Sequence, residues 1–242
     1  MEENQPASVV ADCCLRGRGY CLVPIRVSNK VIHQTHHNKM GIAIDISKWN
    51  GKVDFAGVKS NKPKVDLVII KATQGSSFTD PKFVTNASRA IMNGLPWGAY
   101  HFANLKFTDT SKAAFEQAWH FIKTVNAIGK PSVMVLDVET NEPKLQITGK
   151  QLESFCSIFL SILEQEGLDT AIYMSPGFSW FLPKGHKLGK YKMWIADYTG
   201  AINQVNGWDK FWLHQYTDKG SCAGVKGFWT DDALVKIGRA HV

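Results

Sequence analysis

Short apolar runs recur along the chain after residue 40, and each one ends in a polar residue or a turn. We expect these runs to be buried strands: Ile42–Asp45, Leu67–Lys71, Trp97–Phe102, Val133–Glu139, Ala171–Met174, Met193–Ala196 and Phe211–Gln215. Helical segments are expected between them at Pro81–Met92, Ser111–Val125 and Gly149–Glu166. Single strands that alternate with helices of about 10–17 residues are typical of βαβ units and a parallel sheet.

The two halves of this pattern differ. In the segment Gly149–Glu166, apolar residues such as Leu152, Phe155 and Phe159 repeat at helical spacing. After Gly167 the helical segments shorten and the apolar runs crowd together. The sequence therefore predicts an α/β fold, an irregular (β/α) barrel of the TIM type with a reduced helical second half. A chain of 242 residues fits this fold as one domain, because α/β barrels of about 200–250 residues commonly form one domain.

The composition changes near Met40. The preceding stretch has no regular apolar period, so we expect residues 1–39 to be a disordered leader or upstream segment. Residues 40–236 are the predicted barrel. Residues 237–242 resemble the translation of a sequencing adapter, so we expect a non-native tail there. A mass measurement of the native product would test both expectations.

The charge and cysteine content exclude few classes of protein. A net charge of +7 favours binding to polyanions in general. The chain has eight Trp and thirteen Phe but no dense stripe of Lys and Arg, which argues against a dedicated nucleic-acid binder. No apolar run reaches the roughly 18 residues of a membrane span, so no stable membrane insertion is expected. The five cysteines lack the spacing of a zinc site or a disulfide framework. His101 or His214 is expected to be a buried hydrogen-bonding residue, and no metal is expected.

Polar residues follow the predicted strands at their carboxyl ends. They are Asp45, Lys71, Tyr100, His101, Asp137, Glu139, Asp197 and Gln215. In a parallel barrel all these ends meet on one rim, where active sites lie. A single acid at such a position is commonly a helix cap. Several acids and aromatic residues that converge on one rim indicate a functional site.

Asp137 and Glu139 are two residues apart on one predicted strand. Their side chains should face the same way, with Cα atoms roughly 6–7 Å apart. Because like charges at this distance do not ionise independently, we expect the pKa of one carboxyl to be raised. A protonated carboxylic acid can donate its proton to a glycosidic oxygen. The longer reach of Glu139 makes it the predicted general acid, and an ionised Asp137 would stabilise an oxocarbenium-like transition state or orient the substrate.

Aromatic residues near the same strand ends suggest a sugar-binding groove. They are Trp49, Tyr100, Tyr173, Trp194 and Tyr198. Each of them has packing in the core as its alternative role.

Six ordered motifs resemble glycoside hydrolase family 25, the Chalaropsis-type N-acetylmuramidases common among phage endolysins. The motifs are DISKWNG at Asp45–Gly51, VIIKATQG at Val68–Gly75, GAYHFA at Gly98–Ala103, VLDVE at Val135–Glu139, WIADY at Trp194–Tyr198 and LHQYTD at Leu213–Asp218. The resemblance covers about residues 40–236. It implies an irregular β/α barrel and hydrolysis of the β-1,4 bond between N-acetylmuramic acid and N-acetylglucosamine in peptidoglycan, without a metal or organic cofactor.

The resemblance also implies roles for individual residues. Glu139 matches the proton donor, Asp137 its catalytic partner and Asp45 an acid of the first strand. A further site acid is expected in the stretch Gly227–Leu234, where Asp231 is the first choice and Asp232 the second. The residues expected to bind substrate are Tyr100, Asp197, Tyr173, Trp194, Gln215 and Lys71. Whether Asp137 or the acetamido group of the substrate acts as nucleophile stays open.

Two other functions fit parts of the sequence. A wall-binding module with an inactive site is one, and the presence of Asp45, Asp137 and Glu139 argues against it. A chitinase-like glycosidase is the other, but Ser132 and Val135 stand where such enzymes carry a longer ladder of Asp residues.

The expected partner is bacterial peptidoglycan, with no nucleic acid, and the protein is expected to be a monomer. Residues 1–39 lack the basic and apolar regions of a secretory signal. We therefore expect synthesis in the cytoplasm and action at the cell wall after an endolysin-type release.

Overall fold

The computed structural model describes residues 41–139, 145–200, 202–225 and 235–240, the last range for its backbone alone. The strands are β1 (Gly41–Ile46), β2 (Val65–Gln74), β3 (Phe78–Thr79), β4 (Trp97–Phe102), β5 (Met134–Asp137), β6 (Thr170–Met174), β7 (Lys192–Ala196), β8 (Leu213–Gly220) and β9 (Val235–Ala240). The α-helices are α1 (Phe55–Ser60), α2 (Phe83–Met92), α3 (Thr110–Asn126), α4 (Gly149–Gln165) and α5 (Pro176–Ser179). Two short 3₁₀ helices are η1 (Lys48–Asn50) and η2 (Lys187–Lys190).

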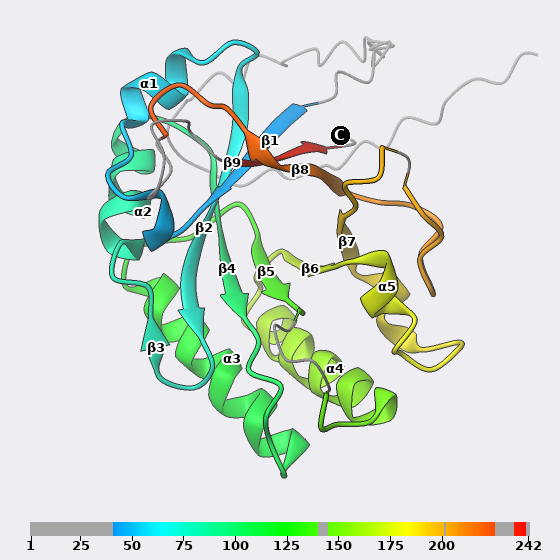
Figure 1. Ribbon diagram of the computed structural model, residues 1–242. Helices are drawn as coiled ribbons and strands as arrows, with labels where there is room; N and C mark the ends of the chain where they lie inside the picture. Colours follow the sequence, from blue (N-terminus) through cyan, green and yellow to red (C-terminus); the bar gives the residue numbers. More distant parts are fainter. Residues whose placement is uncertain (1–40, 140–144, 201, 226–234, 241–242) are drawn as a thin grey trace, which may run out of the picture. The chain divides into compact units, whose positions relative to one another are not determined.

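Eight strands pair in a closed ring. The order is β1-β2-β4-β5-β6-β7-β8-β9, and β9 returns to β1 (Figure 1). Neighbours from β1 to β8 run parallel, whereas β9 is antiparallel to both β8 and β1. The short strand β3 extends the end of β2. This ring confirms the predicted barrel.

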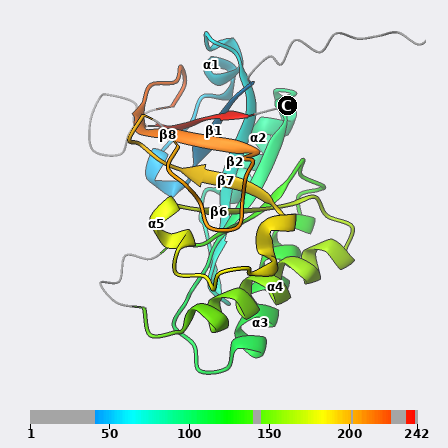
Figure 2. The ribbon, with the colours of Figure 1, turned by 90° about the vertical axis from the view of Figure 1, so that its right-hand side faces the viewer.

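Helices cover mainly the first half of the barrel. α2 and α3 pack on β2, and α3 and α4 lie side by side (Figures 1 and 2). After β6 the described connections contain only the four-residue helix α5 and the 3₁₀ helix η2. The reduced helical second half is therefore also confirmed.

The strands of the first half of the barrel have two buried faces, because helices cover one and the opposite strands cover the other. On β5, Met134 and Leu136 face outward into the core beneath the helices, as does the following Val138. Val133 and Val135 face inward into a separate cluster that fills the barrel. The other members of this inner cluster are Ala43, Ile69, Ala171, Tyr173, Trp194, Ala196 and Leu213. Alternation with period two explains why the strands read as continuous apolar runs in the sequence.

A buried histidine joins the barrel to helix α3. His101 is fully buried, with Nδ1 2.7 Å from Thr73 Oγ1 and Nε2 3.1 Å from Gln117 Oε1. Its ring also packs 5.0 Å from that of Phe159 and 5.5 Å from that of Phe121. Burial lowers the pKa of His101 to about 3, although the Gln117 hydrogen bond opposes the shift. The prediction of a buried hydrogen-bonding histidine is confirmed.

The two predicted end segments have different outcomes. The leader at residues 1–39 lies outside the described residues. The predicted barrel end at residue 236 falls within β9, whose residues 237–240 pair with β1 and β8. The native or non-native origin of residues 237–242 stays a prediction. Across the described ranges, no helix combines the length and hydropathy needed to cross a membrane.

Candidate active site

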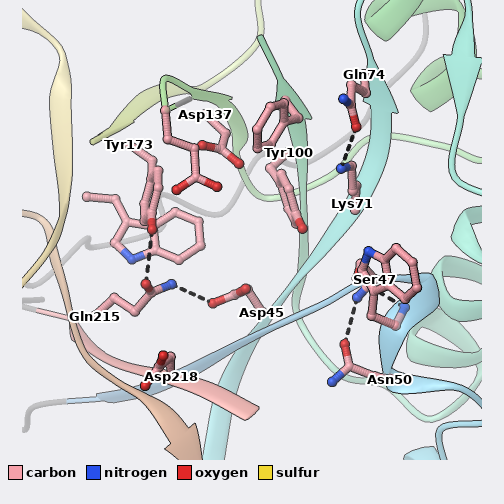
Figure 3. Close-up of a pocket in the computed structure, with 14 residues that line it drawn as sticks. Asp45, Ser47, Asn50, Lys71, Gln74, Tyr100, Asp137, Tyr173, Gln215 and Asp218 are labelled. Atoms are coloured by element: carbon pink, nitrogen blue, oxygen red, sulfur yellow. Dashed lines mark hydrogen bonds between the residues drawn. The ribbon is translucent and has the colours of Figure 1, made fainter. Parts of the chain in front are cut away.

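Inward-facing side chains of seven barrel strands line a common cavity of about 460 Å³ (Figure 3), and β7 contributes Trp194. The other six strands each contribute a polar or phenolic side chain from near their carboxyl ends. They are Asp45 from β1, Lys71 from β2, Tyr100 from β4, Asp137 from β5, Tyr173 from β6 and Gln215 from β8. The carboxyl ends of parallel strands thus build one site, as expected for a barrel of this type.

Carboxylates approach the cavity from three strands and the segment that follows one of them. Asp137 and Glu139 both line it, while the Val138 side chain between them is buried in the outer core. The Val138 amide donates to the Tyr173 carbonyl at 2.9 Å, which fixes the backbone between the two acids. Asp45 projects into the same space from β1 and Asp218 lies at its edge on β8 (Figure 3). The predicted Asp137 and Glu139 pair therefore faces one cavity.

Gln215 connects Asp45 to two tyrosines. It is buried, and its Nε2 donates to Asp45 Oδ2 at 2.8 Å. Its Oε1 accepts the hydroxyl protons of Tyr173, at 3.1 Å, and of Tyr198. The amide of Gln215 is thus held in one orientation, and it holds the Asp45 carboxylate in the cavity wall.

The two phenols that line the cavity stay protonated. Burial raises the pKa of Tyr100 well above its ordinary value, and the negative charges of Asp45 and Asp137 raise it further. Burial is also the largest cause for Tyr173, followed by the charges of Glu139 and Asp137. Both side chains are therefore neutral hydrogen-bond donors next to the carboxylates.

Lys71 is the cation of the cavity. Burial lowers its pKa, and the nearby Asp137 opposes that shift. The ammonium donates to Gln74 Oε1 at 2.9 Å and lies 4.6 Å from the centre of the Phe102 ring. These contacts place a positive charge on the wall of the cavity that leads towards the β2–β3 turn.

The loop after β1 supplies a second part of the wall. Ser47 and Asn50 form a reciprocal capping box around η1, in which the Ser47 amide donates to Asn50 Oδ1 at 2.9 Å. The Lys48 amide donates at 3.0 Å to Oδ2 of the buried Asp80. The loop is therefore fixed at both its ends, and its Trp49 stands at the edge of the cavity.

Asp197 does not line this cavity. Its Oδ1 accepts the amide and hydroxyl of Thr199, and its Oδ2 accepts the amide and side chain of Asn203. Burial would raise the pKa of Asp197, but these hydrogen bonds outweigh it and lower the pKa to about 2. The inward positions of β7 are Trp194 and Ala196, so residue 197 falls on the other side. Asp197 therefore organises the loop between β7 and β8.

A comparison with known protein families identifies the family of this chain. Residues 44–225 match the sequence profile described as Glycosyl hydrolases family 25. The chain belongs to this family. The match spans the strands β2 to β8 and the second half of β1, and so includes every side chain of the cavity.

Individual relatives agree with the family match. The chain is 31% identical to the protein YegX of Escherichia coli O157:H7 over 190 residues, which cover 76% of this chain and 65% of YegX. It is 30% identical to the autolytic lysozyme of Clostridium acetobutylicum over 187 residues, which cover 76% of this chain and 52% of that protein. The chain thus spans less than two thirds of these relatives.

A solved structure shows the shared fold. The bacterial lysozyme of Streptomyces coelicolor superposes with a TM-score of 0.71 at 23% identity, covering 84% of this chain and 92% of that one.

Most residues predicted from the sequence come together in this family 25 cavity. Those that line it are Asp45, Trp49, Lys71, Tyr100, Asp137, Glu139, Tyr173, Trp194 and Gln215, whereas Tyr198 does not line it. Asp197 lies elsewhere, as described, and both Asp231 and Asp232 lie outside the described residues.

Five further residues of the cavity were not predicted. They are Ser47, Asn50, Gln74, Phe102 and Asp218. Gln74 and Phe102 end β2 and β4, so their position at a strand end was a usable signal. Ser47 and Asn50 belong to the η1 loop. Its sequence has no strand or helix period that would predict where their side chains point. In the described part of the chain, no group of three or more His, Cys, Asp or Glu is arranged to hold a metal ion.

Proposed function

We propose that this family 25 chain is an N-acetylmuramidase, a lysozyme that hydrolyses the β-1,4 bond between N-acetylmuramic acid and N-acetylglucosamine in bacterial peptidoglycan. The observation that carries the proposal is the cavity at the carboxyl ends of the strands, where Asp45, Asp137 and Glu139 meet neutral tyrosines and Trp194. Carboxyl pairs that flank a sugar are the usual machinery of glycoside hydrolysis. Relatives named as lysozymes support the same activity.

Glu139 is the proposed proton donor. It gives its proton to the glycosidic oxygen as the bond from that oxygen to the anomeric carbon breaks, so the leaving sugar departs as a neutral alcohol. The resulting Glu139 carboxylate then takes a proton from the water that attacks the anomeric carbon. Glu139 is partly exposed to solvent, whereas Asp137 is only 6% exposed. The proposed donor is therefore the more solvent-accessible acid of the pair.

Asp137 is the proposed partner on the same strand. Its negative charge stabilises the oxocarbenium-like transition state. It then either attacks the anomeric carbon or orients the acetamido group of the substrate for that attack, and both routes retain the anomeric configuration. Asp45 and the Tyr100 hydroxyl face the same sugar and are proposed to hold it in place, as are Trp194 and Lys71.

The activity test uses purified protein on peptidoglycan. We expect the turbidity of a wall suspension to fall and the soluble fragments to carry muramic acid at their reducing ends, as measured by mass spectrometry after borohydride reduction. N-acetylglucosamine at the reducing ends would contradict the proposal. Cleavage of chitin without cleavage of peptidoglycan would indicate a chitinase, and binding without cleavage would indicate a wall-binding module.

Gln215 offers a test of the arrangement around Asp45. Its replacement by Leu removes the amide that joins Asp45, Tyr173 and Tyr198. Asp45 and Tyr173 are buried, and a buried polar group left without its partner costs about 1–3 kcal/mol. A comparable loss of the Asp45 orientation in the transition state would lower kcat about tenfold to hundredfold. Steady-state kinetics on soluble peptidoglycan fragments measures this change.

A matched control is Gln204→Leu, since Gln204 is exposed and does not line the cavity. It should keep the wild-type kcat. Equal kcat for Gln215→Leu and the wild type would show that Gln215 does not position the site.

The partners and location follow from the same proposal. We propose action at the bacterial cell wall as a monomer, without nucleic acid or stable membrane insertion, after synthesis in the cytoplasm and an endolysin-type release. Size-exclusion chromatography with light scattering tests the monomer, and a dimer would contradict it.

A further inference from the structure

A second cavity adjoins the proposed cleavage site. It has a volume of about 440 Å³ and shares Trp49, Lys71 and Gln74 with the first cavity. Its other lining residues come from η1, from the turn between β2 and β3, from the start of β3 and from the segment after β4: Lys48, Gly75, Ser76, Ser77, Phe78 and Asn104. A polymer bound in the first cavity could therefore extend directly into the second.

Two exposed aromatic rings flank a lysine in this second cavity. The Lys48 ammonium lies 4.6 Å from the centre of the Trp49 ring and 5.1 Å from that of Phe78. Trp49 is 56% exposed and Phe78 is 39% exposed, although large apolar rings are usually buried. The rings hold the ammonium in a fixed position while leaving it open to a ligand.

The two cavities differ in charge. Four carboxylates, those of Asp45, Asp137, Glu139 and Asp218, line the first cavity, and none lines the second. Lys48 and Lys71 line the second cavity, and the charge of Lys48 contributes to the lowered pKa of Lys71. Among the described residues, neither ammonium lies within 4 Å of a carboxylate.

The carboxylate of Asp80, beneath the loop, is occupied by backbone amides. Asp80 is 2% exposed, and its carboxylate accepts the backbone amides of Lys48 and Lys82. The Lys48 side chain projects instead towards Trp49 and Phe78. The second cavity is therefore an open cationic site beside an anionic one.

Peptidoglycan carries anionic groups at a defined place. Its muramic acid units bear short peptides with free carboxylates, whereas the sugar rings of the backbone are uncharged. We propose that the second cavity binds a carboxylate of this peptide, with Lys48 as the cation and Trp49 and Phe78 flanking the peptide chain. The proposal rests on the function proposed above. It makes the peptide, as well as the sugar, part of what the protein recognises.

The kinetic test compares two forms of one substrate. Soluble glycan strands are prepared with their peptides and without them. For the second form, an amidase removes the peptides, and the lactyl carboxylates that this hydrolysis leaves on the muramic acid units are converted to amides. For Lys48→Met, which keeps the length of the side chain and removes its charge, we expect KM to rise about tenfold on the peptide-bearing strands. On the stripped strands KM should match the wild type, and kcat should be unchanged on both.

Lys59→Met controls for the overall loss of one positive charge. Lys59 is exposed on α1 and lines neither cavity. It should behave as the wild type on both substrates. An equal KM for Lys48→Met and wild type on peptide-bearing strands would overturn the proposal, and so would an equal rise on both substrates, which would indicate a sugar subsite.

A binding measurement tests the cationic site independently of the proposed hydrolytic activity. The probe is N-acetylmuramyl-L-alanyl-D-isoglutamine, with an analogue whose free carboxylate is amidated as its control, and the signal is tryptophan fluorescence. We expect the wild type to bind the carboxylate form about tenfold more tightly than the amide, and Lys48→Met to bind both alike. Equal affinities in the wild type would overturn the cationic site. Discrimination by a protein that cleaves no glycan would support the site and contradict the proposed muramidase.

Discussion

Replacement of Glu139 by Gln should lower kcat for peptidoglycan hydrolysis by about a hundredfold to ten-thousandfold, the usual contribution of a general acid. Glutamine has the size of glutamic acid and keeps its hydrogen-bonding oxygen, but it carries no proton that it can give to a leaving alkoxide. The barrier therefore rises by about 3–5 kcal/mol while the ground-state contacts remain. Initial rates on soluble peptidoglycan fragments measure the loss.

The expected pattern is a loss of kcat with KM nearly unchanged, because the proton transfer occurs only in the transition state. Glu166→Gln is the matched control, since Glu166 is exposed at the end of α4 and does not line the cavity. Circular dichroism and wall pull-down should show that Glu139→Gln folds and binds as the wild type does. Retention of more than about a tenth of the wild-type kcat would assign the proton donor to another group.

The strand ends of the site could be predicted from the sequence because alternation in a strand is strict. Val133 and Val135 face the barrel interior, so Asp137 and Glu139 continue the same row to the rim. The same reasoning places Asp45 above Ala43. In these rows the apolar residues below determine where the polar residue above must point.

The same rule, applied with the structure in hand, explains Asp197. The sequence motif Trp194–Tyr198 suggested a rim acid, but the inward row of β7 is Trp194 and Ala196. Asp197 therefore faces away from the cavity, and its two oxygens bind the loop at Thr199 and Asn203. A run of apolar residues buried on both faces hides which positions point inward, and this is why the sequence did not distinguish them.

The remaining parts of the site depend on loops and irregular pairing. Asp218 lies beyond a shift of register on β8, between Gln215 and Thr217, so counting along the strand does not place it. Ser47, Trp49 and Asn50 take their positions from the capping box of η1. The cationic second cavity likewise requires the β2–β3 turn to bring Phe78 to Lys48. Contacts of this kind join residues far apart in sequence, and no local period records them.

Acidification from pH 6.5 towards pH 3 should destabilise the fold through His101. Its imidazole is fully buried and its pKa is about 3, whereas an unfolded histidine has a pKa of about 6.5. Between these values the unfolded chain binds one proton more than the folded chain, so the free energy of unfolding rises with pH. The contribution is fully present above about pH 6.5 and is lost as the pH falls through the window, at about 1.4 kcal/mol per pH unit. Summed over the window it is on the order of 5 kcal/mol, which is comparable to the whole stability of many domains.

The measurement is urea unfolding between pH 7 and pH 4.5. The upper part of the window is chosen because Asp197, with a pKa of about 2, contributes stability that is lost only below the unfolded value of about 3.9. His101→Asn should be less stable at pH 7, because it leaves Thr73 or Gln117 without its partner, but should lack the His101 part of the slope. Ile122→Val also destabilises, by about 1 kcal/mol, yet keeps the imidazole and should keep the wild-type slope. If the free energy of unfolding changes with pH by the same slope in His101→Asn and in the wild type, His101 has the same pKa in the folded and unfolded chains. Its burial between the barrel and α3 would then not oppose its protonation.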